Sequence, residues 1–138
     1  MRIKSIDHFV LTVGDIEATC GFYSRVLGVK VVAFGEGRKA IKFGSQKINL
    51  HQAGHEFEPK AARPTPGSGD VCFVSGGTIA EILRRLADEQ VPIVAGPVAR
   101  TGALGPMQSV YFRDPNGNLI EVAVYDAAGW MREESHEK

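Results

Sequence analysis

Hydrophobic and polar residues alternate along this chain in two patterns, and each pattern occurs twice. The segments "SIDHFVLTV" (residues 5–13) and "DVCFVS" (residues 70–75) are rich in β-branched and aromatic residues, as short buried strands are. Each is followed by apolar residues at helical spacing, in residues 16–28 and 78–90. Asp15 is the expected N-cap of the first helix, and Thr78 with Glu81 forms a capping box for the second. A strand and then a helix are therefore expected at the start of each half.

Further strands are expected after each helix. In the first half they are "VKVVAF", "KAIKFG" and "KINLHQ", separated by the turns "GEG" and "SQ". In the second half "VPIVAGPVA" precedes a Gly-rich segment, "RTGALGP" (residues 100–106), and "MQSVYFRDPNGNLIEVAVY" supplies two strands joined by a turn. Each half thus contains a strand, a helix and three more strands.

This repeat of about sixty residues is too long for a solenoid unit and indicates a duplicated module. We predict an α+β fold in which paired βαβββ modules form an open, barrel-like mixed sheet with a concave cleft, the natural place for a site. The 138 residues are expected to form one domain. Its expected parts are module one at about residues 3–53, a Pro- and Gly-rich linker at 54–68, module two at about 69–126 and a charged tail at 127–138.

The composition of the chain limits the kinds of molecule that it is expected to bind. Sixteen basic and sixteen acidic side chains cancel, so no net charge favours nucleic acid or an anionic membrane. The apolar stretches are strand-sized and shorter than a membrane span. The two cysteines form no CxxC pair and no secretory leader is evident, which indicates reduced thiols and a cytoplasmic location. The expected partner is a small molecule, with neither nucleic acid nor membrane.

Polar residues interrupt the expected strands at matching places in the two halves. His8 and Asp70 lie near the head of the first strand of each half, and Asn49, His51 and Glu121 lie within the last strands. Because side chains alternate along a strand, Asn49 and His51 share one face. Glu121 stands between two apolar residues, and burying a lone carboxylate costs several kcal/mol unless a cation, donor or metal accompanies it.

Histidine nitrogen together with carboxylate oxygen suits divalent Zn, Ni, Mn or Fe(II). If His8, His51 and Glu121 converge, they have the composition of a site with two histidines, one carboxylate and open positions for substrate. Taken singly, each residue also has an ordinary explanation, as a capping or core histidine or a solvent-facing glutamate. The repetition of polar residues at matching places favours the metal site.

Several motifs resemble those of the vicinal oxygen chelate superfamily, which includes glyoxalase I, extradiol dioxygenases and the fosfomycin and bleomycin resistance proteins. They are the opening "DHFVLTVGDI", the helix end "FYSRVLG" and the closing "FRDPNGNLIE", and the resemblance extends from Ile3 to about Tyr125. More narrowly, "FGSQKINLHQAGHEFEPKA", "PTPGS" and "GPVARTGALGP" resemble the glyoxalase-domain-containing protein 5 group and its bacterial relatives, called virulence proteins or lactoylglutathione lyase-like.

The resemblance implies paired βαβββ modules, a divalent metal and usually a homodimer. The family takes its metal ligands from the first and last strands of each module, and His8 and Glu121 match two of these positions. Glyoxalase I relatives typically carry Glu or Gln where this chain has Asn49, with His51 two residues on. They carry His where this chain has Asp70. These departures change the charge of the site and remove one imidazole, while His51 and Asp70 remain competent ligands.

The expected function is that of a metal-dependent, glyoxalase-like lyase or isomerase acting on a small carbonyl or carboxylate substrate. The expected metal ligands are His8, His51, Asp70 and Glu121; Glu121 and Asp70 are the catalytic candidates, and Asn49 and Arg100 would bind substrate. Arg100 lies in the Gly-rich segment, which is either a mobile lid or an ordinary surface loop. Glutathione is the co-substrate to consider in the lactoylglutathione branch. The alternatives are a ring-cleaving dioxygenase using Fe(II) and a non-catalytic small-molecule binding or resistance protein.

Overall fold

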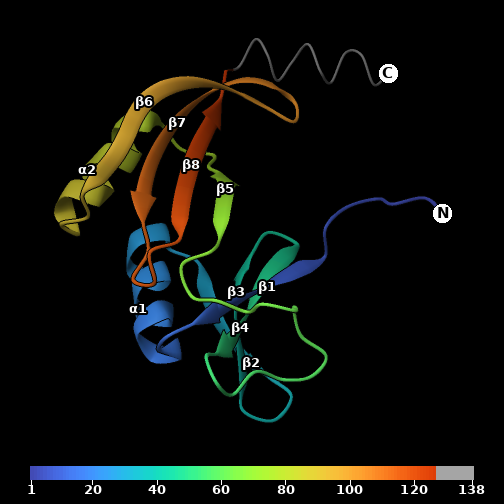
Figure 1. Ribbon diagram of the computed structural model, residues 1–138. Helices are drawn as coiled ribbons and strands as arrows, with labels where there is room; N and C mark the ends of the chain where they lie inside the picture. The colour runs from blue at the N-terminus through green and yellow to red at the C-terminus, as the bar shows by residue number, and fades with distance from the viewer. Residues whose placement is uncertain (127–138) are drawn as a thin grey trace. The chain divides into compact units, whose positions relative to one another are not determined.

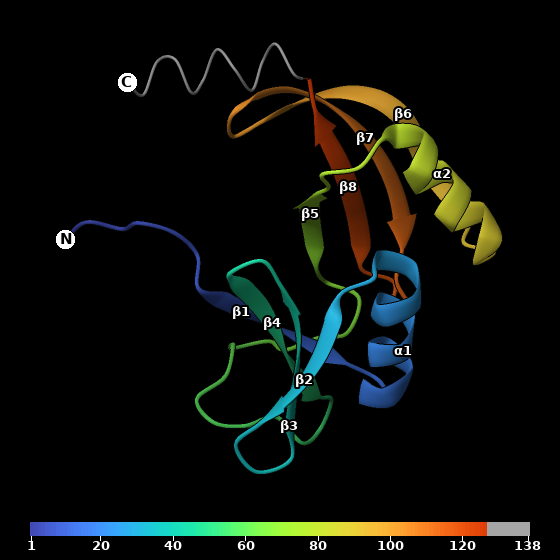
Figure 2. The same ribbon diagram turned by 180° about the vertical axis from the view of Figure 1, so that it is seen from behind.

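The computed structural model describes residues 1–126, and within them each half of the chain forms its own sheet with one helix (Figures 1 and 2). The first module contains β1 (His8–Val13), α1 (Ile16–Leu27), β2 (Lys30–Phe34), β3 (Arg38–Phe43) and β4 (Gln46–Gln52). The second contains β5 (Asp70–Val74), α2 (Ile79–Asp88), β6 (Ile93–Gly102), β7 (Gly105–Arg113) and β8 (Leu119–Tyr125). The predicted α+β fold of paired βαβββ modules is confirmed. The charged tail expected at residues 127–138 lies outside the described residues.

The two modules have the same strand order. The first four-stranded sheet runs β1-β4-β3-β2 and the second β5-β8-β7-β6. In each sheet the first and last strands of the module pair in parallel, and the other neighbours pair antiparallel. The strands form two mixed sheets and not one closed barrel. The shared order is what a duplication of one module produces.

Both helices begin where the sequence predicts. The side chain of Asp15 accepts a hydrogen bond from the backbone nitrogen of Ala18 at 3.1 Å, and that of Thr78 accepts one from Glu81 at 3.1 Å. These caps satisfy amide groups that have no partner inside the first turn of a helix. Gly28 ends α1 with a φ of 68°, a conformation that favours glycine.

Each sheet buries apolar side chains on one face, because strand residues alternate between the two faces. In the second sheet the buried Val110, Phe112, Ile120 and Val122 form this face, against which α2 packs with Leu86. Ser109, Tyr111 and Glu121 alternate with them and therefore point to the opposite face. The alternation thus places the polar residues of β7 and β8 together.

By its contacts the chain divides into two compact units. The first consists of Met1–Gly69 with Asp114–Asn118, and the second of Asp70–Arg113 with β8. The "DPNGN" turn between β7 and β8 therefore belongs to the first unit. The buried carboxylate of Asp114 accepts hydrogen bonds from the Tyr23 hydroxyl (2.6 Å), from the backbone of Asn116 and from both the backbone and side chain of Asn118. This motif, which the sequence predicts as a turn, is also the centre of a buried hydrogen-bond network.

The Gly-rich segment at residues 100–106 forms a β-hairpin, so its interpretation as an ordinary surface loop is wrong. The strand pairing continues through Arg100–Met107 and Thr101–Pro106 to Gly102–Gly105, which leaves a two-residue hairpin turn. Tyr125 holds this hairpin, since its hydroxyl accepts a hydrogen bond from the Leu104 nitrogen at 3.0 Å. A Cβ at Gly102 would lie only 2.3 Å from the same hydroxyl, so glycine is needed for the close approach.

Within residues 1–126, none of the helices is both long and apolar enough to cross a membrane.

Candidate functional site

The predicted site residues are divided between the two units. His8, Asn49 and His51 lie in the first unit, and Asp70, Arg100 and Glu121 lie in the second. Over the described part of the chain, no three His, Cys, Asp or Glu side chains are gathered in a way that could hold a metal ion.

The register between β1 and β4 places the three residues of the first unit on one sheet face. His8 pairs with Lys47, Val10 with Asn49, and Thr12 with His51. His8 and His51 are therefore four positions apart, about 13 Å along the strands. Asn49 lies between them, as a diagonal neighbour of each. Within this unit the structure brings His8 and Asn49 together and does not bring His8 next to His51.

The imidazole of His8 is oriented by the preceding residue. Its Nδ1 lies 2.7 Å from a carboxylate oxygen of Asp7, and its side chain is 44% exposed. A histidine that binds a metal usually has its other ring nitrogen held by a carboxylate in this way. Asp7 precedes β1, so strand alternation does not determine the direction of its side chain. His8 fits a metal through its remaining nitrogen, Nε2.

His51 has surroundings that oppose a metal cation. The residue is 3% exposed, and its Nε2 lies 3.4 Å from Nη2 of Arg38. Burial, and then the charge of Arg38, lower the pKa of the His51 imidazole below its ordinary value. The neutral ring accepts a hydrogen bond from the guanidinium, so a metal at this nitrogen would face a fixed positive charge.

Asn49 carries a buried acceptor without a partner. The residue is 4% exposed, and among the described residues its Oδ1 receives no hydrogen bond. An unsatisfied buried polar atom costs about 1–3 kcal/mol, so this oxygen is suited to a bound cation or donor.

Glu121 lies at the centre of a polar group in the second unit. It pairs with Cys72 on β5 and with Tyr111 on β7, and its Oε2 accepts a hydrogen bond from the Ser109 hydroxyl at 2.6 Å. Burial, and then the charge of Glu121, raise the pKa of the Cys72 thiol to about 11. The thiol therefore stays protonated at neutral pH and is a poor nucleophile. Strand parity could have identified Ser109 and Tyr111, because the "DPNGN" turn sets their register against Glu121.

Asp70 and Arg100 share the sheet face of Glu121. Asp70 is exposed at the start of β5 opposite Leu119, two positions from the pairing of Cys72 with Glu121. The Nε of Arg100 donates a hydrogen bond to the Tyr111 hydroxyl at 3.0 Å, and its guanidinium lies 5.5 Å from the centre of that ring. The second unit thus places three of the predicted residues on one sheet face, with Tyr111 between Arg100 and Glu121.

The two registers show which residues are equivalent in the duplicated modules. His8 and Asp70 are the first residues of β1 and β5. Asn49 pairs with the third residue of β1, as Glu121 pairs with the third residue of β5. His51 takes the position of Ala123. The repeated pair is therefore His8 with Asn49 in the first module and Asp70 with Glu121 in the second.

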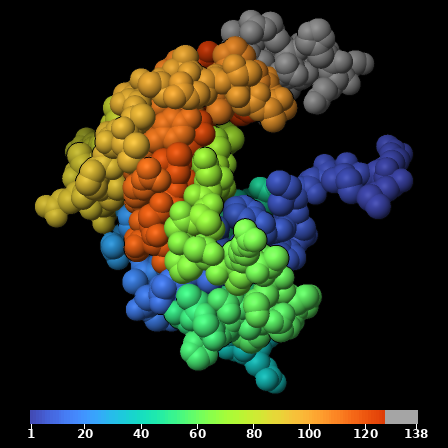
Figure 3. Space-filling view, in the orientation of Figure 1, coloured from blue at the N-terminus to red at the C-terminus, as the bar shows by residue number. Residues whose placement is uncertain are grey.

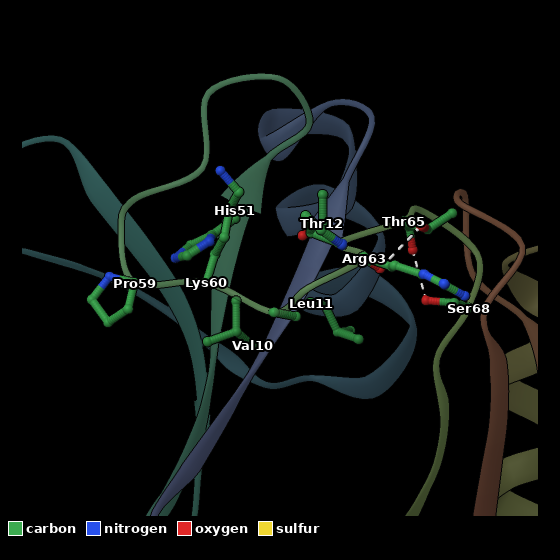
Figure 4. Close-up of a pocket in the computed structure, with 11 residues that line it drawn as sticks. Val10, Leu11, Thr12, His51, Pro59, Lys60, Arg63, Thr65 and Ser68 are labelled. Atoms are coloured by element: carbon green, nitrogen blue, oxygen red, sulfur yellow. Dashed lines mark hydrogen bonds between the residues drawn. The ribbon is translucent and has the colours of Figure 1, made fainter.

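A cavity that the sequence interpretation did not anticipate lies in the first unit. Its volume is about 310 Å³, and it lies between β1, the end of β4 and the linker (Figure 4). Lys60 and Arg63 of the linker line it, together with Thr12 and the buried His51. The sequence marks the linker only as Pro- and Gly-rich, and a local pattern does not show where such a segment folds back.

The sequence of the chain matches a known family over most of its length. A family model described as "Glyoxalase/Bleomycin resistance protein/Dioxygenase superfamily" covers residues 5–122. The chain belongs to this superfamily. The resemblance read from the sequence is confirmed.

Two curated relatives in the superfamily are similar over most of this chain. "Glyoxalase domain-containing protein RDO1" of Mycosarcoma maydis is 54% identical over 128 residues, which is 93% of this chain and 72% of the relative. "Virulence protein STM3117" of Salmonella typhimurium is 54% identical over 125 residues, 91% of this chain and 87% of the relative. The first name refers to a domain and the second to a phenotype, and neither name states a reaction.

Solved structures agree with this assignment. The crystal structure of STM3117 matches with a TM-score of 0.90 and covers 91% of this chain and 100% of that chain. A lactoylglutathione lyase from Agrobacterium tumefaciens matches with a TM-score of 0.68 at 26% identity, covering 90% of this chain and 96% of that chain. These similarities agree with the family match and show that the chain has the fold of this superfamily.

Proposed function

We propose that the chain is a metal-dependent, glyoxalase-like lyase or isomerase that acts on a small carbonyl or carboxylate substrate. The environment of Glu121 carries this proposal. Its half-buried carboxylate has a hydroxyl and a thiol beside it, and among residues 1–126 the structure gives it no cationic partner. A carboxylate in such a place is stabilised by binding a cation.

His8 and Glu121 are the proposed principal metal ligands. His8 offers Nε2, because Asp7 occupies its Nδ1. The equivalent positions add two oxygen donors, the carboxylate of Asp70 and the Oδ1 of Asn49, which has no hydrogen-bond partner among residues 1–126. Nitrogen and oxygen donors of this kind suit Zn, Ni, Mn or Fe(II). His51 is left out of the proposed set because Arg38 lies at its ring nitrogen.

A bound divalent ion would supply Lewis-acid polarisation of a substrate oxygen. When its carboxylate is not held by the ion, Asp70 is the proposed base, since it is exposed on the face of Glu121. Arg100 would bind an anionic group of the substrate. The Tyr111 hydroxyl accepts from Arg100 and so has its own proton available to a substrate oxygen.

Metal binding tests the proposal without requiring a known substrate. Protein freed of metal should bind Mn(II), Ni(II) or Zn(II) at one equivalent per site in titration calorimetry. Glu121→Gln and His8→Gln should each weaken binding at least tenfold, because loss of even a residue that only orients a metal ligand typically costs about 10–100-fold in affinity. The matched controls Glu36→Gln and His55→Gln change exposed side chains and should bind like the parent. A parent protein without affinity for any of these ions, or for Fe(II), would refute the proposal.

Activity then distinguishes the branches of the family. The metal-loaded protein should be assayed with the methylglyoxal–glutathione adduct and with other small carbonyl compounds. Turnover that Asp70→Asn abolishes, with metal binding retained, would support Asp70 as the base. Ring cleavage of a catechol with Fe(II) would instead assign the dioxygenase reaction, and saturable ligand binding without turnover would assign a binding protein.

A further inference from the structure

We propose that the cavity beneath the linker is a binding site for a small organic anion, a carboxylate or phosphate with an apolar body. This linker pocket is bounded by the face of β1 and the end of β4 on one side and by residues 59–68 on the other. The inference goes beyond the proposed function and does not depend on a metal, because its cationic residues are not among the proposed ligands.

The charges that line the linker pocket are all positive. Lys60 and Arg63 contribute cations, and among residues 1–126 no Asp or Glu side chain lines the cavity. Glu58 pairs with Lys60 at 2.5 Å, but both side chains are at the surface, where such pairs exchange easily. Glu56 is held by the backbone nitrogen of Gly54 and does not line the cavity. An anion that enters the pocket exchanges its hydrogen bonds to water for hydrogen bonds to these charged donors.

The linker is held in a defined conformation, so the pocket is preformed. The ring of Phe57 contacts His51 edge-on, with centroids 5.6 Å apart, and the guanidinium of Arg38 lies 4.7 Å from the same ring. Further along, the Ser68 hydroxyl donates to the Thr65 carbonyl at 2.7 Å, and the Gly69 nitrogen donates to Asn118. In Figure 3 the green atoms of the linker lie against the dark blue atoms of the first strand. A preformed site binds without first ordering a loop.

The lining suits a ligand with one apolar and one charged part. Figure 4 shows His51 and Lys60 toward one end of the pocket and Arg63, Thr65 and Ser68 toward the other, with Thr12 between them. Apolar side chains of β1 and three short linker residues complete the wall, namely Val10, Leu11, Pro59, Ala61 and Pro64. The volume of about 310 Å³ is at the lower end for ligand sites, so the ligand is smaller than a typical drug.

Matched probes of different charge test this inference. Benzoate, phenyl phosphate and the neutral benzyl alcohol should be titrated into metal-free protein while backbone amide signals are followed by NMR. We expect saturable shifts of residues 59–68 and of Thr12 with benzoate or phenyl phosphate, and at least fivefold weaker binding of benzyl alcohol. The stronger of the two anions identifies the ligand as a carboxylate or a phosphate. Equal affinity for the neutral and anionic probes would overturn the proposal.

Variants distinguish binding in the linker pocket from a general effect of the charge of the protein. The double variant Lys60→Gln with Arg63→Gln should weaken anion binding at least tenfold, as loss of charged hydrogen bonds does. The control double variant Lys4→Gln with Arg84→Gln removes the same charge from exposed positions and should change binding less than twofold. Ala61→Phe leaves the charge unchanged and should occlude the cavity to all three probes. Equal weakening in the two double variants, or unimpaired binding by Ala61→Phe, would refute the site.

Discussion

The phenol of Tyr23 is buried beneath the "DPNGN" turn and donates a hydrogen bond of 2.6 Å to Asp114. Burial first, and then the negative charge of Asp114, raise the pKa of Tyr23 above its ordinary value of about 10. The unfolded chain therefore ionises this group at a lower pH than the folded chain. Its contribution to stability is complete below about pH 10 and is lost as the pH rises further.

We therefore expect the free energy of unfolding of the parent protein to fall steeply above about pH 10. Tyr23→Phe should be less stable at neutral pH but should lose less stability on going to alkaline pH. Denaturant titrations at a series of pH values measure this, and tyrosinate absorbance should show one tyrosine that ionises only as the parent unfolds. Identical alkaline slopes for the parent and Tyr23→Phe would contradict the assignment.

The carboxylate of Asp114 accepts hydrogen bonds from Tyr23, Asn116 and Asn118 and is 5% exposed. In Asp114→Asn the side-chain NH2 group cannot accept hydrogen bonds, so some of these donors would lose their acceptor. We expect a loss of about 2–3 kcal/mol in the free energy of unfolding. Denaturant unfolding checks this value. Asp88→Asn, which changes an exposed residue at the end of α2, should stay within about 0.5 kcal/mol of the parent.

At the scale of elements, the hairpin between β6 and β7 depends on the close approach of Gly102 to Tyr125. A methyl group at Gly102 would displace the Tyr125 hydroxyl and its hydrogen bond to Leu104. We expect Gly102→Ala to destabilise the protein by about 1–3 kcal/mol, as overpacking does. Gly76→Ala is the control, because no atom lies within 4 Å of its added Cβ, and it should be nearly neutral in the same thermal or denaturant unfolding measurement.

The elements that sequence could predict are those set by local signals. The caps at Asp15 and Thr78 mark helix starts through contacts three residues away, and both are found in the structure. Strand alternation likewise placed Asn49 with His51, and Glu121 on the face opposite Ile120. The Gly-rich hairpin was misread because its strands exist only through pairing with one another, whereas glycine taken locally favours a loop.

The parts of the site that sequence could not supply depend on contacts between distant segments. The position of Arg38 against His51 follows from the packing of β3, β4 and Phe57, and the linker pocket follows from the path of residues 59–68. The equivalence of Asn49 and Glu121 was accessible in principle. Recognising this equivalence requires the register of the parallel strand pairs. Counting residues from the start of each strand gives that register.

At the scale of the whole molecule, duplication divides the proposed metal donors between two modules. His8 and Asn49 come from one and Asp70 and Glu121 from the other. Each module offers one residue at the head of its first strand and one within its last strand, so neither supplies the complete donor set.

Within residues 1–126, β1 and β5 each lie at the edge of their sheet, where backbone groups have no neighbouring strand on one side. Apolar side chains are exposed there, with Ile6 just before β1 at 64% and Val74 in β5 at 62%. Because the same edge is apolar in both modules, we propose that a second copy of the chain covers these strands in a homodimer.

Light scattering coupled to size-exclusion chromatography should accordingly give twice the chain mass of 14.9 kDa. A lysine placed in such an interface buries an unpaired charge, so Ile6→Lys and Val74→Lys should shift the protein toward the monomer. Val94→Lys adds the same charge at the opposite edge of the second sheet, where the side chain is 51% exposed, and should leave the dimer intact. A monomeric parent, or a dimer that only Val94→Lys disrupts, would show that the apolar edges of β1 and β5 are not the surface that joins two chains.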